Sequence, residues 1–337
     1  MHPVKPVSKE KEAWQQMLDS EALFPSQEER KKILVISGPT AVGKTALSLE
    51  IARLVGGEIV SADSMQVYRG MDIGTAKSSK EEQAIVPHHL IDIRTVRETF
   101  HVLDFWQEAS LAIEQILARE KLPIIVGGTG FYMHALLYGP PGGPPADMGL
   151  RKQLRETLIE QGADFLHGEL CRLDSSYAST VSVNDHHKLI RALEIIALTG
   201  QKVSSFARRI NPVSYNMRCW FLHRPKEFLY ERIHERCDHM LEQGLLQEVE
   251  YLLQAGLLEN HSAAMAIGYR QAIEYLSSPR SYEDLEHFVY CFKQASRKYA
   301  KRQFTWFRKE SLFRWLDLEE ISQDRALEII LQDLECS

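Results

Sequence analysis

A phosphate-binding motif is the first group of residues in this sequence that could do chemistry. The segment GPTAVGKT at residues 38–45 satisfies the pattern G-x-x-x-x-G-K-[ST]. Its glycines let the backbone curl so that several N–H groups point at one anion, and the lysine adds a positive charge. The final threonine offers an oxygen to Mg²⁺. The residues expected to contact phosphate are Gly38, Thr40, Ala41, Val42, Gly43, Lys44 and Thr45. The motif predicts a bound di- or triphosphate but not transfer of a phosphoryl group.

A carboxylate could act on a second substrate near those phosphates. Asp63 ends the segment 58–63, and ligands of open α/β sheets bind where the strands end. P-loop NTPases usually place an acid after another apolar strand, but the strand expected at 122–126 is followed by Gly-Gly-Thr. Asp63 could therefore be a base for an acceptor nucleophile or a partner of a metal ion. The alternative is that it caps a turn through Ser64.

The elements that must position these residues alternate along the chain. Apolar runs predict strands at residues 33–37, 58–63, 122–126 and 219–222. Helical spacing of apolar residues predicts helices at 44–54, 103–119, 226–254 with a break near Gly244, and 282–313. Alternation of this kind predicts an α/β fold, with a P-loop NTPase-like parallel sheet flanked by helices.

The middle of the chain interrupts this pattern. The segment GPPGGPPAD at 139–147 is typical of a hinge, and residues 150–201 are mostly helical. We therefore predict a mainly helical inserted domain at 143–214, with the chain returning to the sheet near Asn211. The core then comprises 31–142 and 215–337, and residues 1–30 form a polar extension.

The bulk composition is that of a globular protein and disfavours several classes. Of the 337 residues, 44% are hydrophobic and 26% charged, which is enough to bury a sizeable core. Five cysteines without a CxxC pair indicate reduced thiols and a cytoplasmic protein, and not a disulfide framework or a zinc site. No apolar run is long enough to span a membrane. The net charge of −6 does not favour a nucleic-acid partner.

One local segment departs from the bulk charge. Residues 293–309 contain four aromatic residues, no acid and seven basic residues, which are Lys293, Arg297, Lys298, Lys301, Arg302, Arg308 and Lys309. Like charges four residues apart destabilise an isolated helix, and a phosphate backbone alongside would reverse that effect. The alternative is an amphipathic helix whose aromatic rings face the core and whose charges face water.

Several colinear segments of the chain have distinctive patterns, of which the most specific are SADSMQVYRGMDIGTAK at 61–77 and YAKRQFTWFR at 299–308. Others are GPTAVGKT at 38–45, PHHLIDI at 87–93, VGGTGFY at 126–132, NDHHKLIRALE at 184–194, LHRPKEFLYERI at 222–233 and AIGYRQ at 266–271. Together these segments resemble the tRNA dimethylallyltransferases, also called tRNA isopentenyltransferases. The zinc-finger extension of eukaryotic members has no counterpart here, so the resemblance points to a bacterial-type or organellar member.

The resemblance implies a prenyl transfer. The family moves a dimethylallyl group from dimethylallyl diphosphate to N6 of adenosine 37 of tRNA, next to the anticodon, giving N6-(dimethylallyl)adenosine. The P-loop would then hold the diphosphate leaving group, with Mg²⁺ near Thr45, and no nucleotide would be hydrolysed. The implied catalytic residues are Asp63 as the base, Thr129, Lys44 and Arg232, with Arg236 as a further contact for the diphosphate.

The resemblance also implies a tRNA-binding surface and an extruded base, because a stacked adenine could not reach the carboxylate. The implied tRNA-binding residues are Asp63, Ser64, Met65, Gln66, Thr129, Arg151, His187, Lys188, Arg191, Met265, Gly268, Tyr269, Arg270, Lys301 and Arg302. The tRNA would carry A36-A37-A38 in its anticodon stem-loop. We expect a monomer with no membrane partner.

Three other functions fit parts of the sequence. An adenylate isopentenyltransferase acting on free AMP, ADP or ATP uses the same donor but needs no arm that grips tRNA, whereas residues 299–308 and the insertion favour one. The absence of an acid after Val126 disfavours a small-molecule kinase. The intact Lys44, Thr45 and Asp63 disfavour a non-catalytic RNA-binding protein.

Overall fold

The computed structural model describes residues 31–144, 146–206 and 215–335. The extension predicted at 1–30 and the predicted return of the chain near Asn211 lie outside these residues. The described residues belong to two compact units, and the second unit runs from Tyr138 to Asn211, whereas we predicted the insertion at 143–214. No helix in the described ranges has both the length and the apolar character that crossing a membrane requires.

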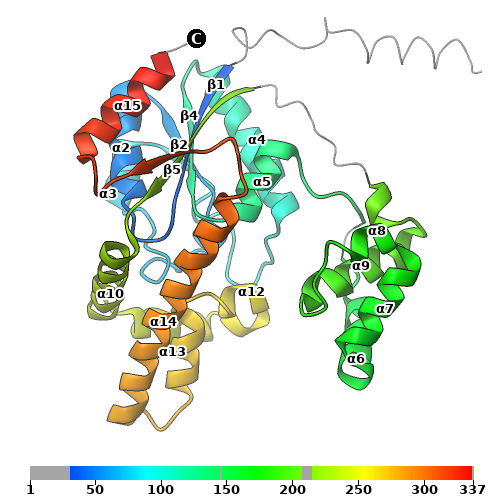
Figure 1. The fold of residues 1–337 in the computed structure, drawn as a ribbon. Helices are drawn as coiled ribbons and strands as arrows, with labels where there is room; N and C mark the ends of the chain where they lie inside the picture. The colour runs from blue at the N-terminus through cyan, green and yellow to red at the C-terminus, as the bar shows by residue number, and fades with distance from the viewer. Residues whose placement is uncertain (1–30, 145, 207–214, 336–337) are drawn as a thin grey trace, which may run out of the picture. The chain divides into compact units, whose positions relative to one another are not determined.

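A six-stranded parallel sheet forms the centre of the first unit (Figure 1). Its strands are β1 (Lys31–Ser37), β2 (Glu58–Ser61), β3 (His88–His89), β4 (Pro123–Gly127), β5 (Tyr215–His223) and β6 (Arg314–Asp317). Their order is β3-β2-β4-β1-β5-β6, and every neighbouring pair is parallel. The expected α/β parallel sheet is thus confirmed. β1 is fully buried from Ile33 to Ser37, which explains its unbroken apolar run.

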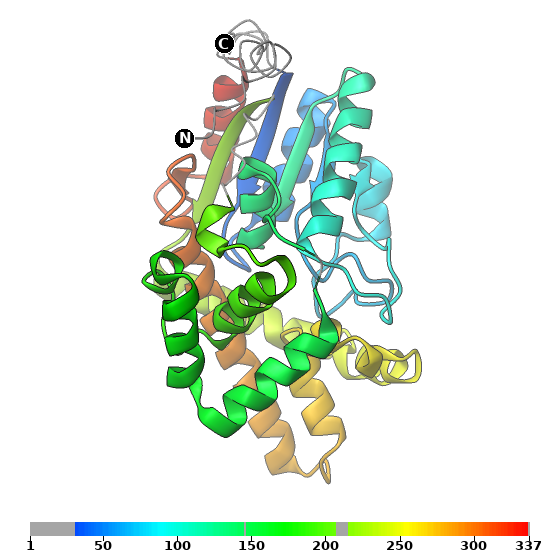
Figure 2. The same cartoon turned by 90° about the vertical axis from the view of Figure 1, so that its right-hand side faces the viewer.

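Helices cover both faces of this sheet. The helices α2 (Lys44–Val55) and α15 (Gln323–Glu335) lie on one face, and α4 (Val102–Ala118) and α5 (Gly130–Tyr138) on the other (Figures 1 and 2). A further group lies beyond the carboxyl ends of the strands: α10 (Lys226–Glu242), α11 (Leu245–Gln254), α12 (His261–Ala264), α13 (Tyr269–Leu276) and α14 (Tyr282–Phe307). The short α3 (Lys80–Ile85) precedes β3, and a 3₁₀ turn at Leu257–Glu259 precedes α12.

One predicted break in a helix is confirmed, and one predicted helix is too long. The break near Gly244 is confirmed, because this glycine adopts a left-handed conformation (φ 99°) between α10 and α11. The prediction of a helix up to residue 313 is wrong, since α14 ends at Phe307 and the chain then forms β6 beside β5. The sequence pattern did not predict β6, because only one of its four residues is fully buried and the strand therefore has no continuous apolar run.

The second unit is helical. It contains α6 (Met148–Gln161), α7 (Ala163–Leu173), α8 (Ser175–Ala178), α9 (His186–Thr199) and a 3₁₀ turn at Val203–Ser205. Leu166, Leu170, Leu189 and Leu193 lie in its own small hydrophobic core. A core of this kind lets the segment form a separate body.

Candidate active site

Three neighbouring strands end at one cavity of about 570 Å³. Ser37 at the end of β1 is in register with Gly127 of β4, and Val126 is in register with Ser61 of β2. The P-loop, the Gly-Gly-Thr turn and Asp63 follow directly after these strands and therefore lie side by side. The sheet order thus brings together three segments that are far apart in the sequence, at the edge where open α/β sheets bind ligands.

The P-loop encloses the start of α2. Gly43 precedes the helix with φ 114°, a conformation that a side chain rarely allows. The Lys44 side chain folds back over the loop, and its Nζ donates to the carbonyl oxygens of Gly38 (2.9 Å) and Pro39 (2.8 Å). Thr45 is exposed and lines the cavity. The helix N-terminus and this lysine make the loop an anion site.

The charge of Lys44 depends on what the cavity holds. Burial lowers the pKa of Lys44 to about 7, and the nearby positive charge of Arg236 lowers it further, while Asp63 acts in the opposite direction. A large part of the lysine is therefore neutral at pH 7 when no anion is present. A bound polyphosphate would place negative charge beside Lys44 and so favour the protonated form of its amine.

Asp63 caps a turn with one oxygen. Its Oδ1 accepts hydrogen bonds from the backbone N–H groups of Met65 (2.8 Å) and Gln66 (3.4 Å). The turn-capping alternative is thus partly realised, although not through Ser64. In the described part of the chain, Oδ2 has no hydrogen-bond partner, and the side chain lines the cavity. The turn holds the carboxylate still and leaves one oxygen able to accept a proton.

Thr129 joins the turn after β4 to the Asp63 segment. Its Oγ1 accepts a hydrogen bond from the N–H of Ser64 (3.2 Å), and its side chain lies near the phenol of Tyr299. Burial raises the pKa of Tyr299, and the charge of Asp63 raises it further, so the phenol keeps its proton. The neutral phenol of Tyr299 and the carboxylate of Asp63 therefore line the same cavity, and Thr129 is bonded to the residue that follows Asp63.

Two arginines of α10 face the P-loop side of the cavity. Arg232 Nε donates to the carbonyl of Ala41 at 2.9 Å, which leaves its terminal nitrogens for a ligand. Arg236 lies one turn further along the helix and also lines the cavity. Burial lowers the pKa of Arg236, and the carboxylate of Asp63 opposes this shift. The two predicted diphosphate contacts are thus placed beside the anion site.

Gln66 lies in the cavity but its amide is largely used within the protein. Its Oε1 accepts from Ser61 Oγ at 2.9 Å, and its Nε2 donates to the carbonyls of Thr75 (3.4 Å) and Ala76 (3.5 Å). The backbone N–H groups of residues 72–74 donate in turn to the Glu248 carboxylate. Gln66 therefore forms part of the cavity wall. To contact the edge of a base, its amide would first have to give up its hydrogen bonds to Ser61, Thr75 or Ala76.

The implied tRNA contacts of α12–α14 have different surroundings. Met265 and Arg270 are exposed. The side chain of Tyr269 is fully buried and donates to Glu248 Oε1 at 2.6 Å, so it would have to be uncovered to touch tRNA, and this contact stays a prediction. Gly268 (φ 89°) begins α13, and a Cβ atom there would lie 3.1 Å from the Phe292 ring. Its role in the structure is to allow a tight turn.

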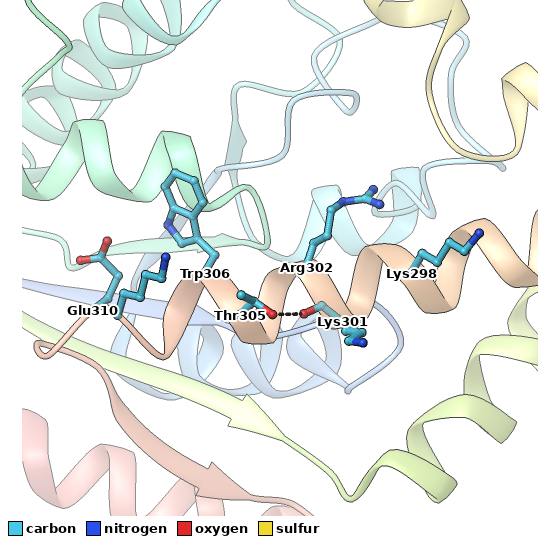
Figure 3. Close-up of a pocket in the computed structure, with 7 residues that line it drawn as sticks. Lys298, Lys301, Arg302, Thr305, Trp306 and Glu310 are labelled. Carbon is cyan, nitrogen blue, oxygen red and sulfur yellow. Dashed lines mark hydrogen bonds between the residues drawn. The ribbon is translucent and has the colours of Figure 1, made fainter. Parts of the chain in front are cut away.

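The basic segment of α14 is less uniform than its sequence. Lys298, Lys301 and Arg302 project from the helix into a shallow groove that Trp306 also lines (Figure 3). Lys293, by contrast, pairs with Asp238 (2.6 Å), and Arg297 contacts His234. Lys293 and Arg297 therefore contribute less to the positive surface of α14 than the sequence of this segment predicts.

In the second unit, two implied tRNA contacts surround a buried carboxylate. Glu194 has a side chain 0% exposed and pairs with Arg151 (2.9 Å) and Arg191 (2.6 Å). His187 and Lys188 are exposed at the start of α9. Arg151 thus ties α6 to α9, whereas Arg191 pairs with Glu194 within α9 and donates to the carbonyl of Pro144; their contact with RNA stays a prediction.

Sequence reasoning missed several residues of the cavity, above all Tyr299 and Gln303. The positions 292, 296, 300, 303 and 307 form the buried stripe of α14. Gln303 is a polar residue in that stripe, and such a residue needs a specific partner, which was the available signal. The described residues contain no group of three or more His, Cys, Asp or Glu side chains placed to hold a metal ion.

Comparison with known proteins places this geometry in a family. The family model described as IPP transferase matches residues 66–310. The tRNA dimethylallyltransferase of Protochlamydia amoebophila (strain UWE25) is 54% identical over 93% of this chain and 92% of its own. That of Chlamydia pneumoniae is 48% identical over 94% of this chain and 93% of its own.

Solved structures agree with these relatives. The full-length tRNA isopentenylpyrophosphate transferase from Bacillus halodurans has a TM-score of 0.67 and 39% identity, over 91% of this chain and 96% of that chain. A eukaryotic dimethylallyltransferase acting on tRNA has a TM-score of 0.76 and 28% identity, over 90% of this chain and 80% of that chain.

Proposed function

Since the chain belongs to the IPP transferase family, we propose that it transfers a dimethylallyl group from dimethylallyl diphosphate to N6 of adenosine 37 in tRNA. The observation that carries the proposal is the meeting of the P-loop and Asp63 in one cavity, with Thr129 hydrogen-bonded to the residue that follows Asp63. An anion site next to a carboxylate suits a donor with an anionic leaving group and an acceptor that must lose a proton.

The leaving group is the diphosphate. As the allylic C–O bond breaks, negative charge develops on the bridging oxygen, and the P-loop N–H groups, Lys44 and Arg232 are directed at it. Arg236 adds a second positive charge from α10. Lys44 and Arg232 are already held in place by hydrogen bonds to the loop, so little reorganisation of these two side chains accompanies the reaction.

The acceptor is the exocyclic amine N6. Its lone pair is delocalised into the ring, so it attacks well only if a proton leaves as the C–N bond forms. Asp63 takes that proton on Oδ2, while its Oδ1 stays in the turn. The Thr129 hydroxyl and the neutral Tyr299 phenol are polar partners for the base or the donor beside the carboxylate. The products are the prenylated adenosine and diphosphate.

Mg²⁺ fits the oxygen-rich side of this cavity. The exposed Thr45 hydroxyl would hold it together with the diphosphate and water, because Mg²⁺ prefers oxygen ligands and commonly binds through phosphates with few protein groups. When bound, the ion would neutralise charge on the leaving group.

The acceptor would be held by surfaces outside the cavity. Lys298, Lys301 and Arg302 provide positive charge for the phosphate backbone. We propose an anticodon stem-loop with A36-A37-A38 as the ligand, with base 37 extruded towards Asp63. The free thiols of Cys171, Cys219, Cys237 and Cys291 support a cytoplasmic location.

The test uses labelled dimethylallyl diphosphate with tRNA bearing A36-A37-A38. We expect label in the tRNA and a mass increase of one prenyl group on A37. A parallel reaction contains AMP in place of tRNA. Transfer to AMP without transfer to tRNA would refute the proposal in favour of an adenylate isopentenyltransferase.

A further inference from the structure

Gln303 of α14 bridges two of the loops that form the cavity. Its Oε1 accepts a hydrogen bond from the Thr40 N–H of the P-loop at 3.0 Å, and its Nε2 donates to the Gly128 carbonyl at 2.9 Å. The residue is only 5% exposed. One partner is a donor and the other an acceptor, so the amide has a single favourable orientation.

The surroundings of Gln303 are built for this contact. A Cβ atom on Gly128 would lie 2.1 Å from Nε2, so the approach requires a glycine at that position. The positions next to Gln303 on the buried stripe of α14 are Ala300 and Phe307. An apolar side chain would satisfy packing at this place, and a buried amide stabilises the protein only when both its ends are paired.

The same turn of α14 reaches the outer surface. Lys301 and Arg302 precede Gln303 directly and line the shallow groove of the helix (Figure 3). The Arg302 guanidinium also lies over the Tyr299 ring, with 5.5 Å between its carbon and the ring centroid, and Tyr299 lines the cavity. The helix that carries the basic residues thus forms one wall of the cavity.

We propose that Gln303 is a positioning residue for the donor, which sets the shape of the diphosphate cradle through the backbone of Thr40 and Gly128. Because Gln303 Oε1 accepts a hydrogen bond from the Thr40 N–H, the backbone amide of Thr40 is turned away from the phosphates. The remaining N–H groups of the loop are then the ones that face the diphosphate. The bond to Gly128 keeps the cradle in register with the turn that carries Thr129. The inference rests on the proposed function, in which the bound anion is the diphosphate of the prenyl donor.

The experiment measures binding of pyrophosphate with Mg²⁺ by calorimetry in the full chain. Gln303→Met keeps the length of the side chain and removes both hydrogen bonds. We expect a Kd for pyrophosphate about tenfold weaker, as for the loss of one or two backbone hydrogen bonds, and a similar rise in KM for the donor. The Kd for tRNA should stay within twofold of the wild-type value.

Two further variants separate positioning from folding. Gln303→Glu keeps the shape and the acceptor for Thr40, but puts a negative charge beside the cradle, so binding should weaken about a hundredfold. Gln294→Met is the matched control, because that amide bonds only to Tyr290 and Lys298 of its own helix. It should leave the Kd for pyrophosphate unchanged.

The outcomes are distinct. Wild-type affinity for pyrophosphate in Gln303→Met would overturn the inference and leave the proposed function standing. Equal losses of pyrophosphate and tRNA affinity, together with a lower unfolding temperature, would also overturn it, because Gln303 would then be a purely structural residue. If the wild-type protein did not bind pyrophosphate at all, the proposed function itself would fail.

Discussion

Raising the pH from 7 to 9 should weaken pyrophosphate binding, because Lys44 loses its proton over this range. Burial and Arg236 lower the pKa of Lys44 to about 7 in the free protein. About half of the lysine is then charged at pH 7, about a tenth at pH 8 and about a hundredth at pH 9. If the charged form is the one that binds, the Kd rises about fivefold from pH 7 to 8 and about tenfold from pH 8 to 9.

The sign follows from linkage between the proton and the anion. A bound diphosphate raises the pKa of Lys44, so above pH 7 the binding of pyrophosphate takes up a proton. Calorimetry in buffers of different ionisation enthalpy counts that proton directly. Pyrophosphate itself loses protons as the pH rises, which strengthens its attraction to positive charge and acts in the opposite direction.

Two variants isolate the lysine, since the titration of the ligand is the same for every protein. Arg236→Gln removes the second cause of the shift, so the pKa of Lys44 rises and the bend in the plot of Kd against pH moves to higher pH. Lys44→Met should bind weakly without the bend. A wild-type Kd with the same pH dependence as that of Lys44→Met, or a bend that stays in place in Arg236→Gln, would refute the reasoning.

Three further predictions concern other parts of the molecule. Asp63→Asn should lower the single-turnover rate of prenyl transfer at least about a hundredfold while tRNA and pyrophosphate still bind, as for loss of a general base, and near-normal turnover would show that Asp63 is not the base. Lys301→Glu combined with Arg302→Glu should weaken tRNA binding and reduce the slope of log Kd against log salt by about 1.5 to 2, whereas an unchanged slope would place α14 away from the RNA. Glu194→Leu should destabilise the helical unit by about 2 kcal/mol in urea unfolding, because it leaves two half-exposed arginines and a backbone N–H without their carboxylate, and a loss under about 0.5 kcal/mol would contradict this role.

The anion site could be predicted because its determinants are contiguous. Eight neighbouring residues specify a tight turn and a helix start, and the apolar run before them specifies a buried strand. The same holds for the break at Gly244, where a left-handed residue separates two helices. Local backbone preferences act over a few residues and are therefore visible in the sequence.

The C-terminal end of α14 and the ion pairing of its basic residues could not be predicted in the same way. The residues after Phe307 keep a helical spacing, but pairing with β5 draws them into β6. In the sequence, Lys293 is one of the seven basic residues of segment 293–309 and no acid lies near it. In the structure it forms an ion pair with Asp238 of α10. Pairings of this kind depend on which elements become neighbours, and nothing in the local sequence records that.

The phosphate cradle, the parallel α/β class and, through the resemblance to a family, the expected reaction could all be predicted from the amino-acid sequence. The position of β4 between β1 and β2, which brings Asp63 and Thr129 beside the P-loop, is known from the folded chain alone. The same is true of the burial of Tyr269 and of the bridge that Gln303 forms between two loops. The physical reason is that a turn or a helix start is stabilised by contacts between near neighbours, whereas an active site is formed where strand order and core packing bring distant residues together.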